Sequence, residues 1–149
     1  MEPTPNRWLQ PPPQSTHSVD VGLRTEAAIL AELVRRGYQL LVPFGTNRRY
    51  DLVLDMNGEF VRAQCKTGRR RRGCIVFNTE STRVNTRGWF ARDYTGEAEI
   101  FLIYFAETER IYAVPVAEAP ASSGSLRIEP TRNGQQDGIR WAHDYELPG

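Results

Sequence analysis

The chain has 149 residues, 40% of them hydrophobic and 25% charged, with a formal net charge of +1 at pH 7; this length fits one domain with one core, and the composition is ordinary for a soluble globular protein. No apolar run approaches the roughly 20 residues that span a bilayer, which excludes a transmembrane helix. The N-terminal stretch lacks the apolar core of a signal peptide, and Cys65 and Cys74 form neither a zinc spacing nor a disulfide framework, so we expect a cytoplasmic protein without a membrane partner.

The first part of the chain predicts an arm followed by a helix. Proline and polar residues dominate residues 1–17, which we interpret as a flexible arm ahead of one domain over residues 18–149. The helix is expected to begin at Ser18 or Asp20 and to end before Gly37, a residue typical of the position after a helix. Its apolar stripe, at helical spacing, consists of Leu23, Ala27, Leu30, Leu33 and Val34.

The rest of the chain predicts short strands. We expect them over residues 38–42, 50–55, 60–66, 74–78, 100–105, 111–116 and 126–129, with a closing segment over 139–145. Residues 79–97 are predicted to be irregular, anchored by Trp89, Phe90 and Tyr94, and residues 117–125 to form a loop. A helix followed by a mixed run of strands favours an α+β or α/β fold with one central sheet.

An Asn57-Gly58 turn fixes the register of the first hairpin, because Asn-Gly between two strand-like runs is the strongest short-range hairpin signal. With a two-residue loop, Asp51 falls opposite Gln64, and directly opposed residues share one face of a sheet. Lys66 follows two residues later and therefore points to the same face. The residues that alternate to the other face are expected in the core: Val61, Ala63 and Cys65.

The lysine on that face is the only one in the chain, since 18 of the 19 cationic residues are arginine. Arginine stays protonated, whereas lysine can lose its proton and carries a compact charge. A carboxylate, an amide oxygen and this ammonium together suit a site that binds a hard divalent cation and a phosphoryl group. Taken singly, Asp51, Gln64 and Lys66 are equally compatible with residues that simply meet water.

Glu26 provides a second carboxylate. It lies three residues after Leu23 and four before Leu30, inside the predicted apolar stripe of the helix. A carboxylate in such a place is costly unless it is paired or binds a metal. The alternative is an acid at the edge of the stripe that reaches water; Glu32, off the stripe, is read as solvated.

Basic residues are concentrated in the first half, where residues 1–75 carry twelve basic and seven acidic groups. The segment 62–72 contains six cations and no acid, and the loop 43–49 ends in two further arginines. Such a stripe suits contacts with nucleic acid phosphates, although a solvated loop is the alternative. The arginines expected to contact phosphates are Arg48, Arg49, Arg69, Arg70, Arg71 and Arg72.

The run formed by Glu26, Asp51 and the Gln64-Cys65-Lys66 element resembles the PD-(D/E)XK nuclease superfamily. It is most similar to small group I intron-encoded endonucleases in which glutamine replaces the acidic residue of the (D/E)XK element. The likeness extends over roughly residues 20–145. Tyr50 stands where the motif name has proline, and Gln64 removes one negative charge.

The resemblance implies an α/β, restriction-endonuclease-like core, a central mixed sheet flanked by helices, and metal-dependent hydrolysis of DNA. By resemblance, Asp51, Gln64 and Glu26 would bind Mg²⁺ or Mn²⁺, and Lys66 would position or deprotonate the attacking water. A homing, defence or junction-resolving role remains open. So does a catalytically silent nucleic-acid-binding module on the same fold, or a scaffold without nucleic acid.

The resemblance also implies a homodimer or a higher two-fold assembly with DNA as partner. We expect its apolar contact patch among Trp89, Phe90, Ile100, Leu102 and Tyr104, although these residues are equally compatible with the core. The aromatic side chains at 89, 90 and 94 could also stack on bases. The two histidines, His17 and His143, are expected to be ordinary surface or packing residues.

Overall fold

The computed structural model describes residues 9–45, 48–85 and 88–149, with the backbone alone for residues 81–85 and 88–92. The helices are α1 (Ser18–Arg35) and α2 (Ala142–Tyr145), with one 3₁₀ turn, η2 (Val116–Glu118). The strands are β1 (Gln39–Leu41), β2 (Leu52–Met56), β3 (Glu59–Thr67), β4 (Arg69–Arg71), β5 (Cys74–Asn78), β6 (Ser81–Asn85), β7 (Gly88–Arg92), β8 (Ile100–Phe105), β9 (Arg110–Pro115) and β10 (Ser123–Arg127).

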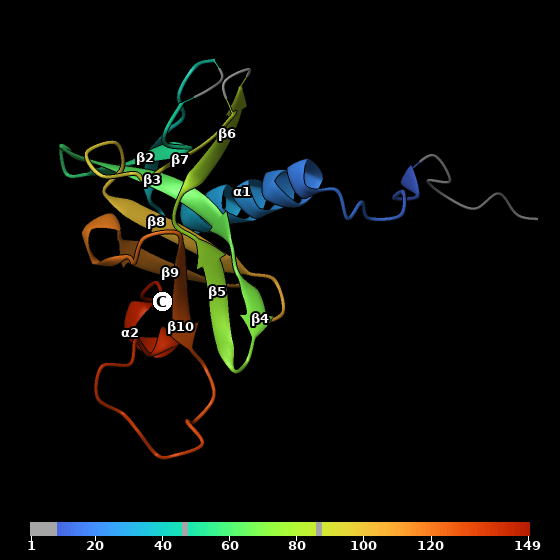
Figure 1. Cartoon of the computed structure of the whole chain (residues 1–149). Helices are drawn as coiled ribbons and strands as arrows, with labels where there is room; N and C mark the ends of the chain where they lie inside the picture. Colours follow the sequence, from blue (N-terminus) through green and yellow to red (C-terminus); the bar gives the residue numbers. More distant parts are fainter. Residues whose placement is uncertain (1–8, 46–47, 86–87) are drawn as a thin grey trace, which may run out of the picture.

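A five-stranded mixed sheet in the order β1-β2-β3-β8-β9 forms the centre of the fold (Figure 1). The β3–β8 pair is parallel, and its neighbours β2 and β9 are antiparallel to it. A parallel pair requires a long crossover connection, and here the chain between β3 and β8 forms β4 to β7. The predicted central mixed sheet is therefore confirmed.

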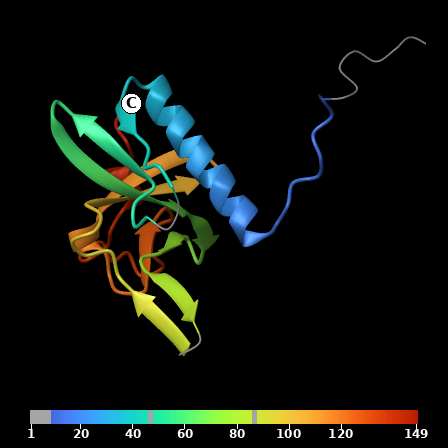
Figure 2. The same ribbon diagram turned by 90° about the horizontal axis from the view of Figure 1, so that it is seen from above.

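Helix α1 lies across one face of this sheet, as the view from above shows (Figure 2). Its start is capped by the His17 side chain, which accepts a hydrogen bond from the Val19 N–H. Its end is a Schellman motif, because Gly37, with φ of 88°, donates to Val34 and the next residue, Tyr38, donates to Leu33. The predicted bounds of the helix are confirmed.

The predicted apolar stripe of α1 is wrong in part. The buried residues are Thr25, Ile29 and Leu33, at i, i+4 and i+8, whereas Leu23 is 65% and Val34 62% exposed. The contact face includes Thr25, which the apolar pattern did not predict. Its hydroxyl shares a hydrogen bond with the hydroxyl of Thr67 in β3. The helix is thus rotated relative to the predicted stripe, and its inward face is more polar than predicted.

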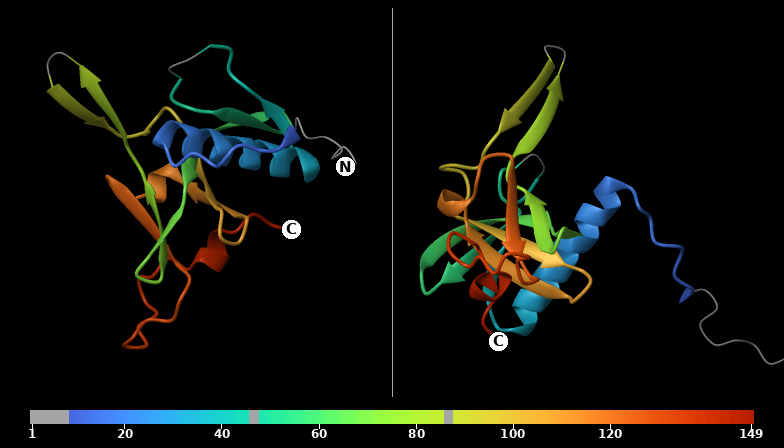
Figure 3. Two further views of the ribbon diagram at one scale, coloured as in Figure 1. Left: turned by 90° about the vertical axis from the view of Figure 1, so that its right-hand side faces the viewer. Right: turned by 60° about the horizontal axis from the view of Figure 1, so that its bottom comes forward.

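Each face of the central sheet carries its own hydrophobic core. On the α1 side, Ile29 and Leu33 pack on residues of β2, β3, β8 and β9. On the other side, Phe101 and Ile103 of β8 pack with β5, β10 and the α2 residue Ala142. That second face is covered by the three-stranded sheet β10-β5-β4 together with α2 (Figure 3). Of the two helices in the described part of the chain, only α1 is long, so a small sheet takes the place of a second long flanking helix.

The first hairpin has the predicted register. Met56 pairs with Glu59 and Leu52 with Ala63, and the turn residues Asn57 and Gly58 have φ of 57° and 90°, as a type I′ turn requires. The core positions of β3 are also confirmed, because Ala63 is buried and its neighbours Val61 and Cys65 pack against the same cluster.

Two irregular segments of the prediction contain strands. Within residues 79–97, β6 and β7 form an antiparallel pair from Ser81↔Arg92 to Asn85↔Gly88. Turn residues near Asn85 and Gly88 between β-branched and aromatic runs were the missed signal. Within 117–125, η2 forms and β10 begins at Ser123, earlier than the strand expected over 126–129, because its small residues pair with β5.

For its β8 residues, the expected apolar contact patch is wrong and the alternative of core residues is confirmed. Leu102 is fully buried, and Ile100 and Tyr104 are partly buried against the core next to α1. The side chains of Trp89 and Phe90 lie outside the described residues. Tyr94 is 4% exposed and belongs to the core, as expected for an aromatic anchor and not for a side chain that stacks on bases.

Ahead of the helix, residues 9–17 extend away from the sheet (Figure 1), and residues 1–8 of the predicted arm lie outside the described residues. Within the described ranges, no helix is both long and apolar enough to cross a membrane.

Two glycines predict opposite effects of the same substitution on stability. At Gly124 in β10, an added Cβ would approach the buried Phe77 ring to 2.4 Å, so Gly124→Ala should destabilise the fold by about 1–3 kcal/mol through overpacking. Gly22 lies within α1 with no atom within 4 Å of an added Cβ, so Gly22→Ala should stabilise it by about 0.5–1 kcal/mol. Urea unfolding of both variants measures this; equal signs would contradict the assigned packing of β10.

Candidate active site

The motif residues meet where strand β2 begins beside strand β3. The β2–β3 ladder starts at Leu52↔Ala63, and from this pair β3 continues to Thr67, paired with β8 on its other edge. Asp51 stands at this point, with its N–H donating to Ala63 O at 2.8 Å and its Oδ2 accepting from Cys65 N–H at 2.8 Å. The Asp51 carboxylate thus occupies the edge of β3 that β2 leaves open.

Gln64 lies between the two residues whose backbones bond to Asp51. Its Oε1 is buried and has no hydrogen-bond partner in the described part of the chain. A buried acceptor without a partner costs about 1–3 kcal/mol, and nearly all such atoms in folded proteins are bonded to something. Gln64 thus presents a buried acceptor that no described group satisfies.

Glu26 approaches the same place from α1. The preceding residue, Thr25, is buried and shares a hydrogen bond of 2.7 Å with Thr67 at the end of β3, which fixes this turn of the helix against the strand. Burial, and then the Asp51 carboxylate, raise the pKa of Glu26. Glu26 and Asp51 therefore interact as like charges, although they come from opposite sides of the sheet edge.

Asp51 itself is held in a low-polarity environment. Burial raises the pKa of Asp51, against the lowering effects of the Cys65 N–H and the Lys66 ammonium. Both carboxylates are thus ionised less readily than in water, and a nearby cation would relieve this. The same surroundings, burial first and then both carboxylates, raise the pKa of Cys65 far above its usual range, so Cys65 is an inert core thiol, as predicted.

Lys66 points to the face opposite Cys65, against the second core. Its Nζ donates to Tyr94 Oη at 3.2 Å and to Glu80 O at 3.5 Å, and lies 4.6 Å from the centre of the Tyr94 ring. Burial lowers the pKa of Lys66 to about 8; Asp51 opposes this lowering, and the Arg49 charge adds to it. Near neutral pH, a fraction of this amine is free to accept a proton.

The structure brings together the four residues that the sequence singled out and adds Tyr94. We had placed Tyr94 as a core anchor, and its ring does pack edge-on against Phe101 at 5.4 Å. Its hydroxyl is also the Lys66 acceptor. No spacing rule could have linked residues 66 and 94, because their contact depends on the long crossover between β3 and β8.

A comparison with protein families decides the identity of the fold. The model of the PD-(D/E)XK endonuclease family matches residues 16–148, almost the whole chain. The chain belongs to the PD-(D/E)XK endonuclease family.

Among solved structures, this endonuclease-family chain is similar to that of a bacterial homing endonuclease, I-Ssp6803I, with a TM-score of 0.69 and 23% sequence identity, over 87% of this chain and 89% of that chain. The likeness confirms the predicted restriction-endonuclease-like fold. No curated protein matches the chain.

The carboxylates of this nuclease-family site do not form a complete metal cluster by themselves. Within the described ranges, no group of three or more His, Cys, Asp or Glu side chains is arranged to hold a metal. Glu26 and Asp51 supply two acidic groups, and the third oxygen at this place belongs to the amide of Gln64. Any cation here would use an amide ligand beside two carboxylates.

The predicted phosphate-contacting arginines fall into two groups. Arg49 pairs with Glu97, and Arg70 bonds to both Glu107 and Glu129, so their charges are largely compensated. The remaining four are exposed: Arg48, Arg69, Arg71 and Arg72. Because Arg70 is engaged in these ion pairs, it is the least available of the six arginines for a phosphate contact.

The single lysine of this endonuclease-family chain gives a direct test of the site electrostatics. NMR titration of lysine-labelled protein should show one side-chain signal with a pKa of about 8, well below the ordinary 10.5. Asp51→Asn should lower this pKa further, because the Asp51 carboxylate favours the ammonium form. The variant Asp137→Asn, which changes an exposed carboxylate in the loop before α2, provides the control. A midpoint near 10.5 in the wild type would contradict the burial of Lys66.

Proposed function

We propose that this endonuclease is a metal-dependent hydrolase of DNA phosphodiester bonds, with Glu26, Asp51, Gln64 and Lys66 as its catalytic set. The observation that carries the proposal is the buried, unpartnered Oε1 of Gln64 beside the Asp51 carboxylate. In a folded protein, such an atom needs a partner, and a bound cation would provide one.

The residues at this place fit a hard divalent cation. Mg²⁺ and Mn²⁺ prefer oxygen ligands and usually keep several waters, so the oxygens of Asp51, Gln64 and Glu26 would suffice as protein ligands. The raised pKa values of the two carboxylates point the same way, because a cation between them offsets both burial and their mutual repulsion. Members of this family typically use divalent metals. When bound, the ion would stabilise the charge that builds up on the phosphate.

Lys66 is proposed to handle the proton of the attacking water. Hydrolysis requires a water to lose a proton as its oxygen bonds to phosphorus and the leaving sugar oxygen departs. An amine with a pKa of about 8 is partly neutral at physiological pH and can accept that proton or orient the water. Tyr94 is proposed as a positioning residue, because its hydroxyl holds the Lys66 Nζ at 3.2 Å.

The substrate is proposed to be duplex or branched DNA, in a homing, defence or junction-resolving role. The similar solved structure is a homing endonuclease, which favours cleavage at a specific duplex site. Purified protein incubated with supercoiled, linear and branched DNA, with Mg²⁺ and with EDTA, tests the function. Metal-dependent cleavage is the expected result. Binding without cleavage under every metal condition would instead favour the silent DNA-binding module.

Lys66→Ala should reduce the cleavage rate by about 10²–10⁴-fold while leaving DNA binding largely intact, because it removes a positioned proton acceptor. In the wild type, the rate should rise with pH through about 8 and then level off, since the neutral amine is the active form. Rates measured across this pH range for both proteins, with exposed Arg35→Ala as control, test the role. A Lys66→Ala enzyme with the wild-type rate and pH profile would rule it out.

Gln64→Glu should tighten Mg²⁺ or Mn²⁺ binding, because an ionised oxygen is a better ligand for a hard cation than an amide oxygen. Gln64→Leu, which lacks any ligand atom, should weaken it. Calorimetric metal titration of the DNA-free protein measures both changes without relying on activity. Identical affinities for the wild type and both variants would place Gln64 outside the metal shell.

The protein is also proposed to act as a homodimer or a higher two-fold assembly. One domain offers one site for one strand, and a two-fold axis supplies the second site with the same chain. Because the β8 residues are packed in the core, the contact is proposed among exposed apolar side chains of the β1–β3 region: Val42, Phe44, Met56 and Phe60. Exposed apolar surface is a common feature of protein contacts.

Light scattering at micromolar concentration, with and without DNA, should show a species of at least twice the chain mass. Phe44→Ser with Phe60→Ser should shift it toward the monomer, because these side chains are 98% and 59% exposed and would lose apolar contact area. A variant with serine at Leu23, exposed on α1, serves as control. A strict monomer in both conditions would leave only a nicking enzyme or a binding module.

A further inference from the structure

The three-stranded sheet β10-β5-β4 has one buried and one exposed face. Directly opposed residues in its ladders include Arg69↔Val76, Arg71↔Cys74, Ser125↔Val76 and Arg127↔Cys74. The alternating residues Ile75, Phe77, Gly124 and Leu126 are buried in the core. We call the opposite side the outer face. It consists of Arg69, Arg71, Cys74, Val76, Asn78, Ser123, Ser125 and Arg127.

The outer face carries positive charge and no negative charge. Three of its eight residues are arginine and none is acidic. The strand β10 contributes Ser123 and Ser125, small hydroxyl residues that leave the face shallow and offer hydrogen-bond donors. The single cation of β4 that points to the inner side, Arg70, is the one paired with glutamates. The alternation along β4 thus puts Arg70, which is paired with glutamates, on the inner side and leaves Arg69 and Arg71 on the outer face.

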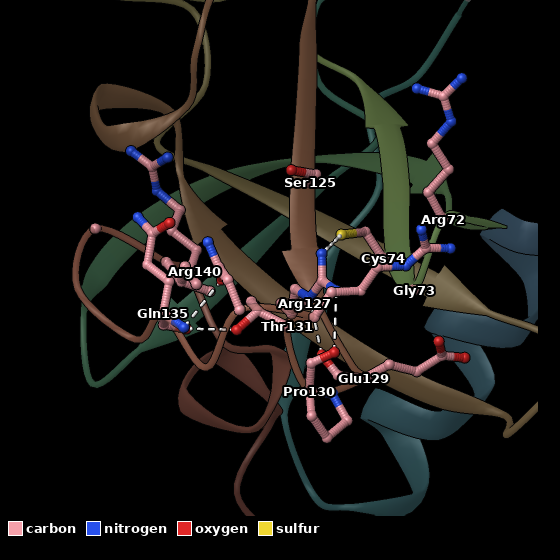
Figure 4. A pocket seen from close by; sticks show the side chains of 14 residues that line it. Arg72, Gly73, Cys74, Ser125, Arg127, Glu129, Pro130, Thr131, Gln135 and Arg140 are labelled. Carbon is pink, nitrogen blue, oxygen red and sulfur yellow. Dashed lines mark hydrogen bonds between the residues drawn. The ribbon is translucent and has the colours of Figure 1, made fainter.

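One end of the outer face deepens into a cavity of about 920 Å³ beneath the loop that joins β10 to α2 (Figure 4). Four arginines line it: Arg72, Arg127, Arg132 and Arg140. Arg127 lies at its centre, between Arg72 and Arg140 on either side. The only acidic residue of the lining, Glu129, binds Arg70 at 2.7 Å.

The cavity arginines are arranged by backbone groups and not by acids. Arg127 donates to Glu129 O at 2.8 Å and Pro130 O at 3.2 Å, and Arg140 donates to Glu118 O at 2.7 Å. Neutral carbonyls orient a guanidinium without cancelling its charge. In the described part of the chain, none of the four lining arginines forms a salt bridge with a carboxylate, so the cavity retains a strong preference for an anion.

Arg72 occupies a backbone position that does not suit arginine. It has φ of 50° and, with Gly73 at 74°, forms the two-residue turn between β4 and β5. Such turns favour Asn-Gly, and the equivalent turn between β2 and β3 is Asn57-Gly58. A non-glycine residue in this left-handed region costs about 1–2 kcal/mol. The turn itself therefore does not account for an arginine at position 72, which points to a role for its charged side chain in the cavity.

The outer face leads from this cavity toward the active site. Strand β5 runs from Cys74, which lines the cavity, to Asn78, and the nearby Glu80 O accepts from Lys66 Nζ. A second hollow of about 480 Å³, lined by Arg69, Arg71 and Glu80, lies along this path. At about 3.3 Å per residue, the six intervals from Cys74 to Glu80 span at most roughly 20 Å, or about six base pairs of DNA at 3.4 Å each.

We propose that the outer face and its arginine cavity bind backbone phosphates of the DNA duplex to one side of the cleaved bond, about six base pairs away. The inference rests on the proposed function for the identity of its ligand. Arginine and serine donors on a shallow surface that is mainly basic contact phosphates and fix the register of a protein on DNA without reading its sequence. The surface would therefore set how far the duplex must extend beyond the site of cleavage.

The test is salt-dependent binding of a long duplex without metal, which is independent of cleavage. The variant Arg72→Asn, Arg132→Ala removes two cavity cations, and its asparagine suits the turn. The control Arg35→Ala, Arg110→Ala removes two cations of glutamate pairs elsewhere, so both proteins lose the same charge. The log–log salt slope should fall by about 1.8 in the cavity variant, about 0.9 for each lost phosphate contact, and remain as in the wild type in the control.

Two further experiments define the ligand. With a duplex of about ten base pairs, the difference in salt slope between variant and wild type should be smaller than with one of about thirty, because the short duplex extends to the cavity in fewer of its bound positions. Inorganic phosphate at matched ionic strength should not displace the long duplex; if it does, the cavity is a site for a free phosphate and the proposal is wrong. Arg72→Asn alone should also raise the melting temperature, and a fall would contradict the reading of its turn.

Equal salt slopes for the wild type and the cavity variant would overturn the inference. An equal loss of slope in the control variant would also overturn it, because the effect would then come from the lower net charge alone. A separate Mg²⁺ cleavage assay of the wild type tests the proposed function. Cleavage with unchanged slopes would reject the phosphate surface alone, whereas changed slopes without cleavage would reject the nuclease activity alone and support the surface.

Discussion

The parting of β2 from β3 is the constraint on which the candidate site depends. As long as two strands are paired, their backbone groups satisfy each other, and no space remains at the shared edge. β2 begins at Leu52, one residue after Asp51, and the Asp51 carboxylate accepts from the Cys65 N–H. A side-chain oxygen thereby stands where a ladder carbonyl would otherwise be. The open edge beyond it admits Glu26 from the helix and leaves the Gln64 amide oxygen without a partner.

The electrostatics of this edge are unfavourable in the isolated protein. Two carboxylates have raised pKa values, one lysine has a lowered pKa, and a buried amide oxygen has no donor. Each departure costs folding free energy. A cation near the oxygens would reduce the cost of the two carboxylates and of the amide oxygen, although it would not raise the pKa of the lysine. Sites that break the usual rules of burial and pairing are often functional, since the surrounding fold must hold them in place. Here the hydrogen bond between Thr25 and Thr67 and the Tyr94 contact with Lys66 provide that support.

The parts of this architecture governed by local rules were predictable from the sequence. The Asn57-Gly58 turn fixed the hairpin register, alternation along β3 separated Lys66 from Cys65, and Gly37 marked the end of α1. Features set by distant contacts were not. The rotation of α1 depends on the Thr25 hydroxyl finding Thr67, and the burial of Leu102 depends on two packed faces. Likewise, the pairing of Arg70 with Glu107 and Glu129 joins residues 37 and 59 positions apart.

The parallel pairing of β3 with β8 has a consequence for when the site comes into existence. All four motif residues lie within the first 66 positions, yet the end of β3 that carries Gln64 and Lys66 pairs with residues 100–104, and Tyr94 lies in the same later stretch. Pairings between segments far apart in sequence must first close a long loop, which slows folding. During synthesis from the N-terminus, we therefore expect the motif to emerge from the ribosome well before it can assemble, so that the nascent chain carries all four motif residues while the candidate site is still unformed.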